Sequence, residues 1–325
     1  MFDIKLKSGK HFRCDESSTI LDAAKKAGVL LEYSCMNARC RSCLVKLTEG
    51  SAINVLDENV LTPQERQKGW ILTCNSKPKS DLVLDVEDLS GYNILKPRTL
   101  PCKVNFIEKV SKDIIKLEVR LPPNANFNFL EGQYVDLIKG NIKRSYSISI
   151  SNNENNLLEF IIKNYDKGVM SNYWFNEAKK DDLLRLNGPL GTFFYRNKVY
   201  KRIIFLATGT GIAPVKSILQ GLENSKVNHG EILVFWGARY QEQLFLDNLP
   251  NVGDKFYKVV SRPESDWGGE IGYVQNVLCR KLEDLTNCAV YACGSSEMIE
   301  SAKNLLTGKG LKEEDFYSDA FVSSN

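Results

Sequence analysis

Four unevenly spaced cysteines constrain this chain more than any other feature of its sequence. Cys35, Cys40 and Cys43 are separated by four and two residues, and thirty further residues precede Cys74. Three close thiolates can wrap a cluster from one loop while a distant fourth closes it, and this spacing is typical of two-iron, two-sulfur ligation. The alternatives are structural zinc, which usually draws on two close cysteine pairs, and four unrelated buried thiols. We predict a 2Fe-2S cluster held by all four residues.

The N-terminal segment, the histidines and the remaining cysteines exclude several other kinds of site. The opening MFDIKLKSGK lacks the apolar core of a secretory signal, so we expect a cytoplasmic protein whose nine cysteines stay reduced. The histidines, His11 and His229, lie far apart in sequence, which argues against Rieske ligation, most zinc hydrolases and histidine-based triads. The cysteines outside any ligand spacing are expected to be packed thiols: Cys14, Cys102, Cys279 and Cys288.

Size and charge indicate a soluble protein of several domains. A length of 325 residues suits two or three domains, and 43% hydrophobic with 26% charged residues is ordinary for a soluble chain. No apolar run approaches the roughly 18 to 20 residues that span a bilayer. The net charge of +3 forms no basic block. We therefore expect neither a nucleic-acid nor a membrane partner.

Periodicity divides the chain into three regions. Residues 3–14 alternate around Ser8-Gly9 as a hairpin, residues 19–28 have helical spacing, and Thr62 to Glu65 form a capping box with Pro63 at the first helical position. A strand at 82–86 precedes a polar linker at 88–98. Alternating segments from 102 to about 198 predict an antiparallel barrel. From 201 onward, apolar strands alternate with helices, which predicts a parallel, helix-covered sheet.

The cysteine loop carries the first family resemblance. The run CMNARCRSC with the distant Cys74 resembles the plant-type ferredoxins, which implies a small α+β sheet domain of the β-grasp type over residues 1–90. That family usually has glycine at the position of Ala38 and often a small residue at Arg41, so this sequence departs from the pattern at two positions where the backbone approaches the cluster. Arg39 and Arg41 could dock an acidic partner, or they could simply be solvated.

The second region contains a flavin motif. Arg144-Ser145-Tyr146-Ser147 resembles the RxYS signature of the ferredoxin-NADP reductase superfamily, although an alternating strand alone would look similar. An arginine suits a phosphate, a tyrosine ring can lie on the isoalloxazine, and Ser147 can bond near flavin N5. Residues 168–171 and 188–191 match the superfamily's GxxS and GPxG elements, which implies an FAD-binding barrel over residues 98–198. The expected flavin contacts are Arg144, Tyr146, Ser147, Gly168, Val169, Met170 and Ser171.

The third region contains a glycine turn between a strand and a helix. Residues 207–214, ATGTGIAP, resemble the GGxGxxP-like turn of the same superfamily, with Thr208 in place of a frequent glycine. The resemblance implies a nicotinamide beside Cys293, an adenosine near Arg239, and an NAD-binding α/β domain over residues 199–325. NADH is favoured over NADPH because Glu242 would oppose a 2′-phosphate. The expected contacts are Thr208, Gly209, Thr210, Gly211, Gly237, Arg239, Cys293, Gly294 and Phe321, with Ser147 and Cys293 as catalytic residues.

The resemblance extends over essentially the whole chain. Segments such as LEGQYVDLI, NGPLGTFF, GTGIAPVKS and VYACGSSEMI resemble the CDP-6-deoxy-delta-3,4-glucoseen reductase family. This implies that NADH reduces FAD, which passes single electrons to the 2Fe-2S cluster. The implied acceptor is an iron-sulfur, pyridoxamine-phosphate-dependent CDP-sugar dehydrase that removes the C3 hydroxyl of a CDP-4-keto-6-deoxyhexose in O-antigen sugar synthesis. The alternatives are a reductase component of a bacterial oxygenase and a redox sensor or binding module.

Overall fold

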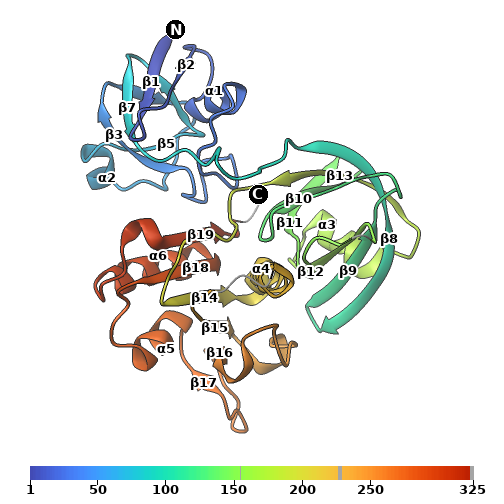
Figure 1. Cartoon of the computed structure of the whole chain (residues 1–325). Coiled ribbons are helices and arrows are strands. Elements are labelled where there is room, and N and C mark those ends of the chain that lie inside the picture. Colours follow the sequence, from blue (N-terminus) through green and yellow to red (C-terminus); the bar gives the residue numbers. More distant parts are fainter. Residues whose placement is uncertain (154, 226–228, 323–325) are drawn as a thin grey trace. The chain divides into compact units, whose positions relative to one another are not determined.

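The first sheet of the fold has five strands and one helix packed on it. A computed structural model describes residues 1–153, 155–225 and 229–322, and the chain forms two units, Met1–Ile94 and Leu95–Phe321 (Figure 1). The sheet order in the first unit is β2-β1-β7-β3-β5, with β4 and β6 as a separate pair. The strands are β1 (Phe2–Leu6), β2 (His11–Cys14), β3 (Leu44–Glu49), β4 (Ala52–Asn54), β5 (Trp70–Leu72), β6 (Ser76–Pro78) and β7 (Leu82–Asp85).

Local sequence signals explain the elements of this unit. The β1–β2 hairpin turns at Gly9, whose φ of 83° favours glycine. Helix α1 (Ile20–Lys26) is capped by Thr19 and buries one apolar face against the sheet. Helix α2 (Pro63–Gln67) has the capping box that the sequence predicts, because the Thr62 hydroxyl accepts from Glu65 N and the Glu65 carboxylate accepts from Thr62 N. The five-stranded sheet with α1 packed on it confirms the predicted α+β fold of this unit.

A six-stranded antiparallel sheet opens the second unit. Its order is β11-β10-β13-β8-β9-β12, and a bridge between Ile148 and Phe160 joins the two edges. The half-barrel surrounds a core that includes Trp174 and Phe160. The segment Val169–Glu177 adds a short helix, α3 (Val169–Asn172), and a π-helical turn. The strands are β8 (Arg98–Ser111), β9 (Ile114–Arg120), β10 (Tyr134–Lys139), β11 (Ile142–Ser147), β12 (Leu157–Lys163) and β13 (Leu183–Leu190).

A parallel sheet completes the second unit. Its order is β17-β16-β15-β14-β18-β19, so the chain runs outward from β14 in one direction and returns to its other side with β18. Ligands of such sheets bind at the carboxyl edge where the strand order reverses, here between β14 and β18. The strands are β14 (Arg202–Thr208), β15 (Glu231–Ala238), β16 (Phe256–Val260), β17 (Glu270–Ile271), β18 (Cys288–Gly294) and β19 (Phe316–Ala320).

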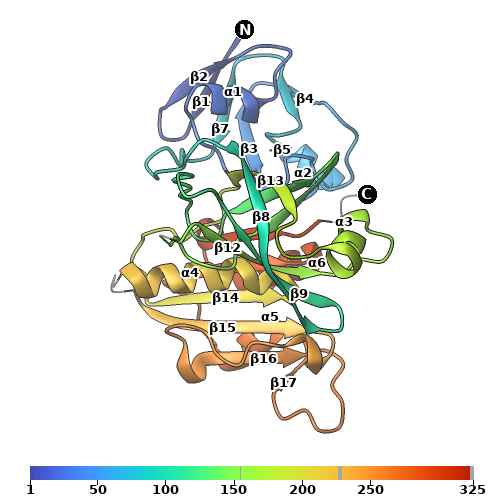
Figure 2. The ribbon, with the colours of Figure 1, turned by 90° about the vertical axis from the view of Figure 1, so that its right-hand side faces the viewer.

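Helix α4 links the two sheets of the second unit. It spans Ile212–Ser225, starts directly after the turn Gly209–Gly211, and lies between β14 and β12 in both views of the ribbon (Figures 1 and 2). Helices α5 (Val274–Lys281) and α6 (Ser296–Thr307) contact each other and the parallel sheet. Among the described residues, none of the helices has the length and apolar character needed to cross a membrane.

Candidate redox site

The four predicted cluster ligands form two thiol pairs in the first unit. Cys43 Sγ lies 3.2 Å from Cys74 Sγ, and Cys40 Sγ accepts from the backbone N–H of Cys35 at 3.3 Å. A hydrogen bond from Cys40 lowers the pKa of Cys35 to about 5, and one from Cys43 lowers the pKa of Cys74. The same bonds, with burial, raise the pKa values of Cys40 and Cys43. In each pair, one thiol therefore has the lower pKa.

Two thiol pairs fit a two-iron cluster. Each iron of a 2Fe-2S cluster shares two bridging sulfides and takes two cysteine thiolates, so the cluster needs two pairs and no single point of convergence. Within the described ranges, no three Cys, His, Asp or Glu side chains are arranged to hold one metal ion. All nine cysteines are free thiols. The assignment of the four ligands stays a prediction that this donor set supports.

The cluster loop adopts glycine-like backbone conformations without glycine. Met36, Ala38 and Arg41 have φ values of 56°, 56° and 63°, in the left-handed region that L-residues rarely occupy. Ala38 and Arg41, the two positions at which the ferredoxin pattern has small residues, thus have a backbone conformation that glycine favours. Arg41 donates to the carbonyl of Val60 at 2.6 Å and pairs with Glu65 on α2. It is half-buried and bonded within its own unit.

Strand β11 carries the predicted flavin residues. The Tyr146 hydroxyl accepts from Trp174 Nε1 at 3.0 Å, and its ring meets Trp174 and Phe160 edge-on. Burial raises the pKa of Tyr146 to about 12, so the phenol stays neutral. Ser147 is buried at the end of the strand, while Arg144 donates to the carbonyl of Lys143. The Tyr146 ring, held in place by Trp174, and the Ser147 hydroxyl next to it are groups that suit contact with an isoalloxazine ring.

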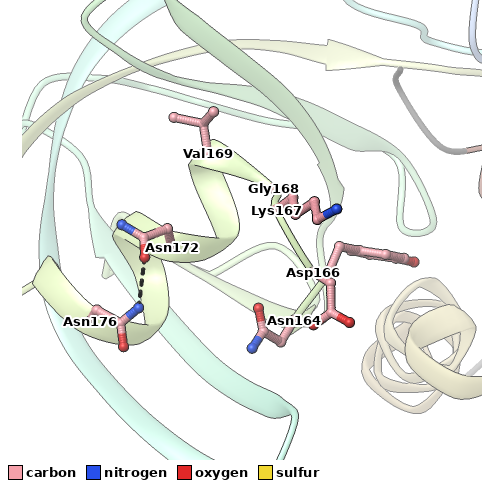
Figure 3. A pocket seen from close by; sticks show the side chains of 8 residues that line it. Asn164, Asp166, Lys167, Gly168, Val169, Asn172 and Asn176 are labelled. Atoms are coloured by element: carbon pink, nitrogen blue, oxygen red, sulfur yellow. Dashed lines mark hydrogen bonds between the residues drawn. The ribbon is translucent and has the colours of Figure 1, made fainter.

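A pocket of about 460 Å³ opens beside the predicted phosphate-binding turn (Figure 3). Gly168 and Val169 line it, but Met170 and Ser171 do not: Met170 packs into the barrel core and the Ser171 hydroxyl accepts from Tyr165 N at 3.1 Å. A Cβ on Gly168 would lie 3.0 Å from that hydroxyl, so a larger residue would fit there only if Ser171 shifted. The lining also contains side chains that the sequence reasoning missed: Asn164, Tyr165, Asp166, Lys167, Asn172 and Asn176.

The predicted nicotinamide residues meet at the switch point of the parallel sheet. A Cβ on Gly211 would lie 2.3 Å from the carbonyl oxygen of Cys293, so the turn after β14 rests directly on the end of β18. Thr208 extends β14, and its hydroxyl accepts from Ser295 N at 3.2 Å. Gly209 has a φ of 54°, as a glycine turn requires. The structure thus brings the ATGTG and Cys-Gly segments together, and the missing glycine at Thr208 does not disturb the turn.

Cys293 and Phe321 lie at this edge in different ways. The Cys293 side chain is fully buried in the core, where burial and then Asp319 raise the pKa of its thiol well above the usual value. A neutral thiol of this kind can shape a site but cannot act as a nucleophile. The backbone N–H of Phe321 donates to the carbonyl of Gly294 at 2.7 Å. This bond keeps Phe321 at the carboxyl edge, next to the predicted nicotinamide position.

The adenosine end of the predicted site contains a second arginine. Gly237 is buried near the end of β15, and Arg239 follows it, exposed. The N–H of Arg262 donates to the carbonyl of Arg239 at 2.9 Å, and its guanidinium donates to the Tyr240 hydroxyl at 3.5 Å. The sequence reasoning missed Arg262, because 22 residues lie between it and Arg239 in the chain. Only the pairing of β15 with β16 brings the two arginines together.

Three sequence families match the chain in succession. The 2Fe-2S iron-sulfur cluster binding domain matches residues 4–79, the oxidoreductase FAD-binding domain residues 101–195, and the oxidoreductase NAD-binding domain residues 205–304. The crystal structure of Amycolatopsis cytochrome P450 reductase GcoB has the same fold, with a TM-score of 0.74 at 21% identity over 99% of both chains. Fold and site together define an NAD(P)H-dependent oxidoreductase that uses a flavin and a 2Fe-2S cluster.

Whole-chain relatives narrow this class. The CDP-6-deoxy-L-threo-D-glycero-4-hexulose-3-dehydrase reductase of Yersinia pseudotuberculosis is 41% identical over 98% of this chain and 97% of its own length. The phenol hydroxylase P5 protein of Acinetobacter pittii is 28% identical over 97% and 93%. The chain belongs to the CDP-6-deoxy-L-threo-D-glycero-4-hexulose-3-dehydrase reductase family, and the reductases of oxygenase systems are its more distant relatives.

Proposed function

We propose that this chain carries electrons from NADH to a CDP-4-keto-6-deoxyhexose 3-dehydrase during C3-deoxygenation of the sugar, in the cytoplasm. The observation that carries the proposal is the agreement between the whole-chain relationship to such reductases and a complete set of three cofactor elements. The acceptor would be an iron-sulfur, pyridoxamine-phosphate-dependent dehydrase, and the pathway O-antigen sugar synthesis.

The residues divide this work between them. Thr208, Gly209, Thr210 and Gly211 would hold the dinucleotide, with Gly294 and Phe321 at the nicotinamide and Gly237 and Arg239 at the adenosine. Tyr146 and Ser147 would orient the flavin, with Arg144 and the turn at Gly168 on its phosphates. Bound FAD would convert hydride into single electrons for a 2Fe-2S cluster, which the thiolates of Cys35, Cys40, Cys43 and Cys74 would hold as ligands. Cys293 would shape the nicotinamide pocket as a buried neutral thiol.

Reconstitution tests the proposed acceptor. The purified chain, mixed with a CDP-sugar dehydrase of this class, CDP-4-keto-6-deoxyglucose and NADH, should yield the 3-deoxygenated sugar, measured by mass spectrometry of the nucleotide sugar. A mixture lacking this chain is the control. Rapid NADH-dependent reduction of an artificial acceptor without any deoxygenation would contradict the dehydrase assignment and favour an oxygenase system. No reduction of either acceptor would favour a redox sensor.

The same assay tests the choice of dinucleotide. NADH is proposed, although two arginines, Arg239 and Arg262, whose backbones are joined by a hydrogen bond, lie at the proposed adenosine end. We expect kcat/KM to be higher for NADH than for NADPH, because Glu242, an exposed acidic residue three positions after Arg239, would repel a 2′-phosphate. Equal or inverted kcat/KM values would contradict the preference, and would leave the dehydrase assignment unaffected.

A further inference from the structure

A line of polar side chains on α4 contacts the loop that continues the flavin strand. Lys216 Nζ donates to the carbonyl of Ser149 at 3.1 Å, and Ser217 Oγ donates to the carbonyl of Ile150 at 2.7 Å. The N–H of Ser151 donates to Gln220 Oε1 at 3.1 Å. Asn224 adds a bond to the hydroxyl of Ser151, also at 3.1 Å. Four successive contacts therefore fix α4 to the segment directly after Ser147.

A buried carboxylate anchors this line. Glu159 on β12 is 7% exposed, and Lys216 Nζ donates to its Oε1 at 2.7 Å. The Ser149 hydroxyl donates to the same oxygen at 2.8 Å, and Lys116 pairs with Oε2 at 3.0 Å. Burial alone would raise the pKa of Glu159, but the two lysines and Ser149 outweigh it and lower the pKa. The Glu159 carboxylate therefore stays charged, and it binds Lys116, Lys216 and Ser149 at the same time.

The contact joins the two halves of the predicted reaction centre. Lys216 lies one helical turn after Ile212, the first residue of α4, which follows the dinucleotide turn Gly209–Gly211. Ser149 lies two residues after Ser147, the predicted flavin residue. A side chain that reaches from the first segment to the second can therefore set the distance between them.

We propose that Lys216, held by Glu159, is a positioning residue for hydride transfer. The step that depends on this spacing breaks the C4–H bond of NADH and delivers hydride, with its two electrons, to N5 of the flavin, leaving NAD⁺ and reduced anionic flavin. Transfer of this kind requires near-contact geometry, and a displacement of about 1 Å can cost up to about 10²-fold in rate. Lys216 would act by fixing the dinucleotide turn against the flavin strand.

The chain contains a matched control. Lys116 pairs with the same carboxylate, but it comes from β9 of the half-barrel and does not reach α4. Lys116→Met and Lys216→Met each remove one cation from Glu159, so a general effect of lost charge would appear in both variants. Only Lys216→Met loosens the contact between the two predicted binding segments.

The experiment is anaerobic stopped-flow reduction of the bound flavin by NADH, with the purified holoprotein and no dehydrase. We expect Lys216→Met to lower the limiting rate constant about tenfold and weaken the NADH–flavin charge-transfer absorbance, while the dissociation constant of NADH changes less than about twofold. Lys116→Met should stay within about twofold of wild type. Equal losses in both variants, an unchanged rate in Lys216→Met, or a change confined to the dissociation constant would overturn the proposal.

A second variant covers the case in which Lys216→Met does not retain flavin. Glu159→Gln keeps the size of the side chain and the bond from Lys216 to the Ser149 carbonyl, but it removes the charge that holds Lys216. It should lower the same rate constant by a smaller factor, about threefold, with flavin content unchanged. A wild-type rate in Glu159→Gln, or a loss no larger than that of Lys116→Met, would then overturn the proposal. The measurement requires only the flavin and a reduced dinucleotide, so its outcome is independent of which protein accepts the electrons.

Discussion

At Gly294 the chain has room for a hydrogen atom and nothing larger. Its φ is 142°, and a Cβ there would lie 2.0 Å from the Thr208 hydroxyl, which itself accepts from Ser295 N. Glycine is therefore required here for two reasons: the positive φ, and the close approach of the ends of β14 and β18. Both arise at the carboxyl edge, where the dinucleotide is proposed to bind.

Gly294→Ala should consequently destabilise the second unit and weaken dinucleotide binding. Backbone strain alone costs about 1–3 kcal/mol, and the contact with Thr208 adds to it. Denaturant unfolding and the KM for NADH measure the two effects. Gly272→Ala is the control, because Gly272 has a φ of 117° and no atom within 4 Å of the added Cβ. Equal losses of unfolding free energy in the two variants would show that the close approach does not matter.

Among the elements, α2 depends most on its cap. It has five residues and no buried side chain, so packing contributes little to it, and the reciprocal bonds between Thr62 and Glu65 keep it in place. Glu65 also pairs with Arg41, whose backbone is in the left-handed region. The helix thus supports the cluster loop through one carboxylate.

Glu65→Ala should speed the loss of the cluster. Hydrogen bonding by Arg41 lowers the pKa of Glu65 to about 2 from 4.5, so the stabilisation is complete above pH 4.5 and is lost as the pH falls towards 2. The difference from wild type in the rate of visible bleaching should therefore be the same at about pH 7 and about pH 5. Glu49→Ala, at the exposed end of β3, is the control. A difference that shrinks markedly between these two pH values would contradict this role for the ionised carboxylate.

Across the whole molecule, the proposed cofactor residues separate by unit. The four cluster cysteines belong to Met1–Ile94, and the proposed flavin and dinucleotide residues belong to Leu95–Phe321. Loss of the cluster should therefore leave the first electron transfer intact, because no proposed flavin or dinucleotide residue lies in the cluster unit.

Cys74→Ala should lose the 2Fe-2S spectrum and nearly all transfer to a one-electron acceptor such as cytochrome c. Its flavin should still be reduced by NADH within about twofold of the wild-type rate. Cys14→Ala is the matched control, since Cys14 is a buried thiol of the same unit with no proposed ligand role. Slow flavin reduction in Cys74→Ala, with normal reduction in Cys14→Ala, would show that the units do not work independently.

Sequence reasoning found most of the strands, and two of those that it missed were missed for identifiable reasons. β13 ends in Gly188-Pro189-Leu190, which looks like a turn, yet these residues continue a strand paired with β8 and β10. β19 has the sequence FYSDA, whose apolar content is low for a buried parallel strand. Its pairing with β18 over five residues outweighs that weak pattern. Both misses reflect partners that lie far away in the chain.

The sequence by itself determined the cofactor chemistry. Three local patterns carry this information: the thiolate spacing for the cluster, the RxYS strand for the flavin, and the glycine turn before a helix for the dinucleotide. In each pattern, residues close together in the sequence supply most of the groups that bind the cofactor. The tertiary structure alone decided how these sites are held. The pairing of Arg41 with Glu65, the contact of Gly211 with Cys293, and the reach of Lys216 to Glu159 all join residues from distant segments. Such contacts depend on strand order and helix placement, which no local pattern encodes.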